Sequence, residues 1–154
     1  MVLTGNFQGK NLECTKPELE QLYYSPRANS VRHYYQNESE GRVEFTGDVL
    51  PAHTLPYDGL NGCEWGKWRD DLVAAARASG VEPDSYRHVV ISVPWRPGCR
   101  AGQAGDGHYA IIYFCNHLQT IVHEVGHNFG FAHAKKAGIE YGDKTSSMGA
   151  GVGP

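Results

Sequence analysis

Long apolar runs are missing from this sequence, and so is a strong charge of either sign. No run approaches the roughly 18 apolar residues that a membrane helix needs, so we expect no membrane partner. The net charge is −3 at pH 7 and the 14 Lys and Arg residues are scattered, which argues against a nucleic-acid partner. The 154 residues show no repeat and no linker, so we expect one domain over 1–154. We also expect the protein to be a monomer.

Cysteine is sparse, and no CxxC pair occurs, which argues against a zinc ribbon or a thioredoxin-like site. An even count with wide spacing fits two disulfides and an oxidising compartment, although four reduced, buried thiols are an alternative. The cysteines stand at Cys14, Cys63, Cys99 and Cys115. We expect a secreted or extracellular protein. Because the start of the chain lacks a signal-peptide pattern, the leader would lie outside this chain.

The spacing of apolar residues predicts a mixture of strands and helices. Short β-branched or alternating runs indicate strands, and apolar residues at steps of three and four indicate helices. The expected strands cover 2–7, 43–47, 87–94 and 108–115, and the expected helices cover 17–24, 26–36, 65–79 and 117–129. The second helix would begin with Ser25 as its N-cap and Pro26 at its first position.

Three of the 8 histidines fall within one stretch, HEVGHNFGFAH, at 123–133. Residues four apart share a helix face, so His123 and His127 can point two imidazoles at one ion. Gly130 can take the positive φ that ends a helix and turns the chain, which would return His133 as the third ligand. Three imidazoles leave a fourth position for water, as in a catalytic zinc site.

Glu124 directly follows the first histidine, beside the expected ion. It can take a proton from a water held there, and is the candidate catalytic residue. Ordinary residue frequencies produce the whole pattern by chance on the order of once in 10⁵ chains. The alternatives are a helix with surface histidines and a purely structural zinc site. We interpret the other histidines as polar residues outside the site, namely His33, His53, His88, His108 and His117.

HExxHxxGxxH followed by a methionine resembles the signature of the metzincin metallopeptidases, with Met148 in TSSMG at the position of their Met-turn. Three further segments are similar to the gametolysin-like peptidases (family M11). They are EYGDKTSSMG at 140–149, NESEGR at 37–42, and SYRHVVISVP at 85–94 with the Gly-rich loop after it. The resemblance therefore extends over nearly the whole chain.

The resemblance implies an α+β catalytic domain. Its sheet would be twisted and mostly parallel with an antiparallel edge strand, its long helices would include the zinc-binding helix, and a short irregular C-terminal subdomain would carry the Met-turn. It also implies one catalytic Zn²⁺ and a metalloendopeptidase acting on extended protein or peptide substrates, namely extracellular, matrix or cell-wall proteins. Gly130 and Met148 would be structural. The strand before the zinc helix would bind substrate as an edge strand, through His108, Tyr109, Ala110 and Ile111.

Three departures from the family pattern stand out. No tyrosine stands two residues after Met148, so the extra tyrosine ligand of astacin- and serralysin-like enzymes is expected to be absent. Ala134 stands where several metzincin families place Glu, Asp or Ser. The chain continues for six residues after Met148, so we expect the family's C-terminal helix to be absent. The last departure leaves a catalytically inactive or truncated zinc-holding module as the alternative function.

Two further expectations concern the surroundings of the zinc site. Tyr141 and Asp143 are candidates to brace the histidines from outside the ligand set, with a plain loop role as the alternative. Asp106, in a Gly-rich loop, is a candidate contact for a calcium ion.

The cysteine pairing is predicted from position in the chain. Cys99 and Cys115 bracket one loop and one strand, which favours their pairing. Cys14 and Cys63 are then paired by elimination. A competing hypothesis makes Cys14 a zinc-binding thiolate that keeps the enzyme latent.

Overall fold

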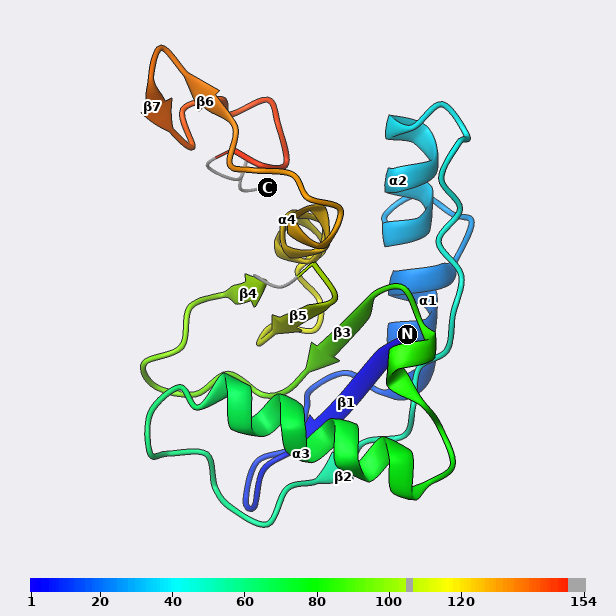
Figure 1. Ribbon diagram of the computed structural model, residues 1–154, viewed down its shortest axis with the longest axis vertical. Coiled ribbons are helices and arrows are strands. Elements are labelled where there is room, and N and C mark those ends of the chain that lie inside the picture. Colours follow the sequence, from blue (N-terminus) through cyan, green and yellow to red (C-terminus); the bar gives the residue numbers. More distant parts are fainter. Residues whose placement is uncertain (105–106, 150–154) are drawn as a thin grey trace.

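The computed structural model describes residues 1–104 and 107–149, and its centre is a five-stranded sheet (Figure 1). Four strands are parallel, and β4 is an antiparallel strand at one edge. In spatial order they are β2 (His53–Thr54), β1 (Val2–Asn6), β3 (Val89–Ser92), β5 (Tyr109–Ile112) and β4 (Gly102–Ala104). The mixed architecture with a mostly parallel sheet is thereby confirmed. Asp106, the expected calcium contact, lies outside the described residues.

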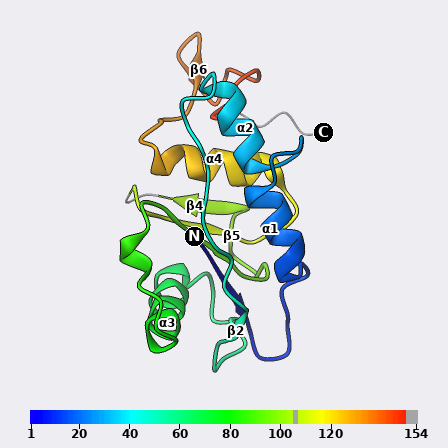
Figure 2. The ribbon, with the colours of Figure 1, turned by 90° about the vertical axis from the view of Figure 1, so that its right-hand side faces the viewer.

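Helices cover both faces of this sheet (Figures 1 and 2). Successive strand residues point to opposite faces, so Leu3 and Ile91 belong to a core with α3, whereas Val2 and Val90 belong to a core with the other helices. The helices are α1 (Lys16–Tyr24), α2 (Val31–Glu38), α3 (Trp65–Ala78) and α4 (Leu118–Asn128), with a 3₁₀ turn, η1 (Pro83–Ser85). In the described part of the chain, α4 is followed by β6 (Lys135–Lys136), β7 (Ile139–Glu140) and irregular segments.

One helix begins later than predicted. α2 starts at Val31, because the Ser30 side chain accepts the His33 backbone N–H at 3.1 Å and caps the helix there. Asn29 has a φ of 66°, which is incompatible with a helix running on from Pro26.

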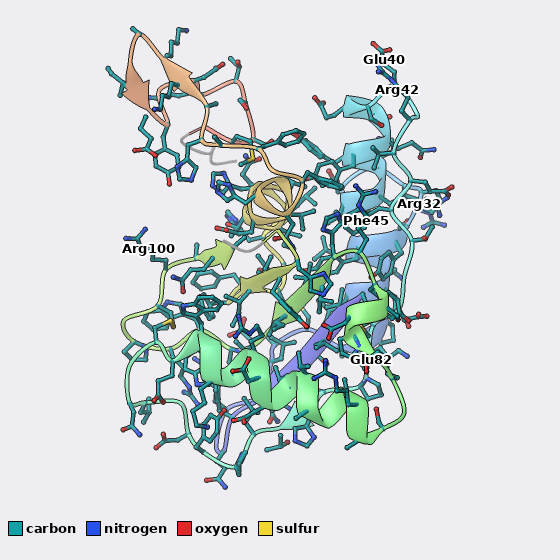
Figure 3. The ribbon with its side chains drawn as sticks, viewed as in Figure 1. Arg32, Glu40, Arg42, Phe45, Glu82 and Arg100 are labelled. Carbon is teal, nitrogen blue, oxygen red and sulfur yellow. A yellow bond between two sulfur atoms is a disulfide. The ribbon has the colours of Figure 1, made fainter. Side chains whose placement is uncertain are left out.

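The strand predicted for 43–47 is also wrong, because this segment has no strand partner in the described structure. Its alternation reflects packing instead. The ring of Phe45, labelled in Figure 3, has its centroid 5.8 Å from that of Tyr35 and 6.4 Å from that of Phe129. The helices at 17–24, 65–79 and 117–129, and the strands at 2–7, 87–94 and 108–115, are confirmed to within a few residues at each end.

Two disulfides are present, but the predicted pairing is wrong. Cys14 pairs with Cys115, and Cys63 pairs with Cys99. Cys14, just before α1, and Cys115, just before α4, both belong to the core on the α1 side of the sheet. Cys63 and Cys99 pack against the opposite core. Because Cys14 is bonded, the latency-switch hypothesis is excluded for this state of the protein.

Among the described residues, none of the helices combines the length and the apolar character needed to cross a membrane.

Candidate metal centre

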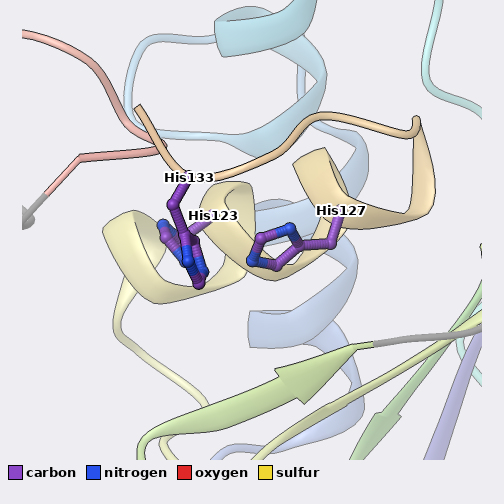
Figure 4. A group of neighbouring side chains, drawn as sticks. All are labelled: His123, His127 and His133. Atoms are coloured by element: carbon purple, nitrogen blue, oxygen red, sulfur yellow. The ribbon is translucent and has the colours of Figure 1, made fainter. Parts of the chain in front are cut away.

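Helix α4 carries the first two histidines of the site. Its Ile121, Val122 and Val125 are buried against the sheet-side core, which fixes the rotation of the helix about its axis. His123 and His127 are one turn apart on another face of the helix, with ring centroids 4.8 Å apart (Figure 4). The burial of the apolar stripe therefore determines where these two imidazoles point.

The helix ends in a Schellman motif at Gly130, which has a φ of +88°. The Phe131 N–H donates to the Gly126 carbonyl at 3.0 Å, and the Gly130 N–H donates to the His127 carbonyl at 2.8 Å. This pair of bonds defines the motif. The turn carries the chain back across the helix, as the sequence predicts.

The returning chain places His133 beside the other two rings. Its ring centroid lies 5.3 Å from that of His123 and 4.7 Å from that of His127. One ligand atom from each of the three residues lies within 4.8 Å of the others. Within the described ranges 1–104 and 107–149, this is the one group of His, Cys, Asp or Glu residues that could hold a metal ion.

Each histidine is oriented by an oxygen atom at its Nδ1. His123 Nδ1 donates to the Ser147 carbonyl at 2.8 Å, and His127 Nδ1 donates to the Phe131 carbonyl at 2.8 Å. His133 Nδ1 donates to a Glu140 carboxylate oxygen at 2.7 Å. Since these oxygens accept hydrogen bonds, the proton of each neutral ring is on Nδ1 and each Nε2 keeps a lone pair for a metal.

This donor set fits a zinc ion. On tetrahedral zinc, with Zn–N bonds of about 2.0–2.1 Å, neighbouring ligand atoms lie about 3.3 Å apart, so modest inward movements of the rings would close the site. The pKa of His123 is lowered, chiefly by burial, which also favours the neutral form that binds metal.

Glu124 lies on the buried side of the site, and 8 % of its surface is exposed. Burial raises the pKa of its carboxyl to about 7. The side chain packs against Gly102 of β4, where an added Cβ would lie 2.7 Å from the Glu124 Cγ. A larger residue at position 102 would displace the carboxylate, so Gly102 is part of the site, although the sequence reading did not single it out.

Met148 is buried beneath α4 and packs its sulfur against Gly126 so closely that a Cβ at position 126 would overlap it. The same loop supplies the Ser147 carbonyl that orients His123. Ala134 N–H donates to the Met148 carbonyl at 2.8 Å, which ties this loop to the segment that carries His133.

Glu140 and Tyr141 complete the surroundings of His133. Tyr141 contacts the ring through its hydroxyl, 2.8 Å from Nε2, so it does reach a histidine, but not at the Nδ1 where a bracing residue was expected. The Asp143 carboxylate accepts hydrogen bonds from Thr145 instead. Glu140 was missed in the sequence, because no spacing rule links a residue seven positions away to a histidine ring.

The expectation of a substrate-binding edge strand at His108 to Ile111 is wrong in its premise. β5 pairs with β3 on one side and with β4 on the other. Its backbone groups are therefore used within the sheet, and Ala110 and Ile111 are buried. The edge strand next to β5 is β4, which packs against α4.

Three convergent imidazoles with a buried carboxylate beside them, on a helix that packs on a mostly parallel sheet, indicate a metal-dependent hydrolase. The chain belongs to the gametolysin peptidase M11 family, whose model matches residues 12–153. This match confirms the predicted family and supports the assignment as a metallopeptidase. No curated protein and no solved structure was found to match.

Proposed function

We propose that this protein is a zinc-dependent endopeptidase in which Glu124 is the general base. The observation that carries the proposal is the convergence of three Nε2 lone pairs next to one buried carboxylate. The two disulfides fit an extracellular setting, so we propose extracellular, matrix or cell-wall proteins as substrates. We further propose that the protein is a monomer and binds neither nucleic acid nor membrane.

His123, His127 and His133 would hold the ion. When bound, zinc would polarise the scissile carbonyl and lower the pKa of a bound water toward ~7. Glu124 would accept the proton of that water and pass it to the leaving amine. A carboxyl with a pKa of about 7 in the metal-free protein is poised to do both. Met148 would have a structural role, packing beneath the helix.

The substrate would add to the sheet at β4. Its outer edge has no partner strand among the residues described, and an extended peptide can hydrogen-bond such an edge as an additional strand. Gly102 of β4 touches the Glu124 side chain, so a peptide on this edge would run past the catalytic carboxylate. This proposal replaces the residues of β5 as the substrate-binding strand.

Cleavage of casein and of quenched peptides by the zinc-loaded protein tests the function. We expect chelator to abolish cleavage, and Glu124→Gln to lower kcat/KM by roughly 10²–10⁴-fold, the usual contribution of a general base. Glu20→Gln, which changes an exposed carboxylate on α1, is the matched control and should cleave normally. Both variants should keep one zinc per chain.

The alternative, a zinc-holding module without activity, makes the opposite prediction. The wild-type protein would bind one zinc and cleave nothing in a broad peptide library. Glu124→Gln would then be indistinguishable from the wild type in the cleavage assays. The burial of Glu124 beside the triad favours the enzyme, because a purely structural zinc site needs no acceptor for a proton.

A further inference from the structure

The hydroxyl of Tyr141 lies at the metal-facing side of the triad. It is 2.8 Å from Nε2 of His133, and the two ring centroids are 3.9 Å apart. The Tyr141 ring is also roughly parallel to that of His123, at 6.1 Å between centroids. A residue that merely braced His133 from outside would contact Nδ1, but that nitrogen is already bonded to Glu140.

The direction of this hydrogen bond follows from the other side of the ring. Because His133 Nδ1 donates to the Glu140 carboxylate, Nε2 carries the lone pair, and the Tyr141 O–H donates to it. A metal ion held by His133 would use this same lone pair. The hydroxyl therefore occupies the direction from which the ion is bound, and it must give up this hydrogen bond when the ion arrives.

The displaced oxygen would not have far to go. Ligand atoms on tetrahedral zinc lie about 3.3 Å apart, and the Tyr141 oxygen already lies 2.8 Å from Nε2. A shift of about half an ångström would bring it to ligand spacing, which leaves no room for a water between it and the ion.

The backbone holds Tyr141 in this position. β6 and β7 form a hairpin whose two turn residues, Ala137 and Gly138, both have positive φ, 52° and 78°, as a tight two-residue turn requires. Tyr141 follows directly and has a φ of 59°, a left-handed conformation that is unusual for a tyrosine. This conformation, immediately after β7, allows Glu140 and Tyr141 to reach the two nitrogens of the same imidazole.

We propose that Tyr141 is the fourth protein donor of the metal site, with its hydroxyl oxygen bound to the ion in the resting protein and its proton released to solvent on binding. This inference rests on the proposed metal-binding function. It replaces the expectation that the chain lacks a tyrosine ligand, because the tyrosine comes from the hairpin before Met148 rather than from a position after it. The water that Glu124 would activate, and then the substrate carbonyl, would have to displace the phenol or enter beside it.

Loading with Cu²⁺ and with Zn²⁺ tests the proposal. With one Cu²⁺ per chain, the wild-type protein should show a phenolate-to-copper charge-transfer absorption that Tyr141→Phe lacks. Competition with a chelating dye should show zinc binding weakened roughly tenfold or more in Tyr141→Phe. Tyr86→Phe is the matched control, since it removes a hydroxyl that bonds Asp48, and it should match wild type in both measurements.

The outcomes separate the two claims. If the wild-type protein binds one zinc and cleaves peptides but shows no charge-transfer band, or if Tyr141→Phe keeps the band, the tyrosine is not a ligand and the peptidase proposal stands. If the wild-type protein binds neither metal, both proposals fail. An equal unfolding midpoint for metal-free wild type and Tyr141→Phe would show that the variant is folded.

Discussion

Helix α4 and the segment 131–149 supply the same site, but they are held in different ways. α4 contributes His123, Glu124 and His127, and its apolar stripe is buried between the sheet and α2. The segment 131–149 contributes His133, and its hairpin strands are exposed. The helix is positioned by hydrophobic burial, whereas the segment depends on a few hydrogen bonds and on one buried side chain, Met148.

Because of this difference, one part of the site can be preformed while the other part responds to metal binding. Two of the proposed ligands and the proposed base are placed by the core without an ion. The third proposed ligand is placed by local contacts. A bound metal would favour these contacts, because a ligand stabilises the state that binds it. The first group of contacts should govern global stability, and the second should govern metal affinity.

The largest effect on the free energy of unfolding should come from the loss of a disulfide. Cys14–Cys115 joins the chain before α1 to the chain before α4 and closes a loop with a sequence separation of 101. Replacing both cysteines with serine should lower the free energy of unfolding by about 4–5 kcal/mol, from loop-closure entropy. Urea denaturation of the metal-free protein measures this. A loss below about 1 kcal/mol would mean that α4 is held without this bond.

A second test compares pH dependence with and without the Glu124 carboxyl. Because burial raises its pKa from 4.5 to about 7, the folded protein binds this proton more tightly than the unfolded chain. The contribution is fully favourable below pH 4.5 and is lost as the pH rises through 7. Between pH 5 and pH 8, metal-free wild type should lose about 2–3 kcal/mol relative to Glu124→Gln. Parallel unfolding curves across this range would contradict the buried carboxyl.

The contact between the two regions can be tested at Gly126. In Gly126→Ala, the new Cβ overlaps the Met148 sulfur, and overpacking of this kind destabilises by about 1–3 kcal/mol. Gly66→Ala in α3 is the control, because nothing lies within 4 Å of its added Cβ. That change should stabilise by about 0.5–1 kcal/mol, through helix propensity alone. Equal effects at the two glycines would show that Met148 moves freely.

The sequence was most informative where one local rule decides the structure. The helix at 117–129, its end at Gly130 and the return of His133 all follow from periodicity and from a single positive φ. Gly126 and Gly102 carried a weaker signal, since an isolated glycine inside a helix or strand often marks the close approach of another group. That signal does not say which group approaches.

Other features depend on packing that a linear pattern does not encode. The cysteine pairs are decided by which face of the sheet each residue reaches, and Cys99 and Cys115 lie on opposite faces. The strand at 108–115 was identified, but its place inside the sheet was not, because β4 comes from a Gly-rich loop with no strand pattern. Glu140 and Tyr141 reach His133 only through the hairpin turn.

Zinc stoichiometry after chelation and reloading tests the account most directly. Native mass spectrometry of the wild-type protein should show one zinc per chain, and His133→Ala should show weak binding or none while keeping the unfolding midpoint of the metal-free wild type. Since α4 is positioned by the core, its two histidines should keep their places in this variant. Two ligands alone should not bind zinc tightly. An unchanged zinc content in His133→Ala, or no zinc in the wild type, would contradict the three-histidine site.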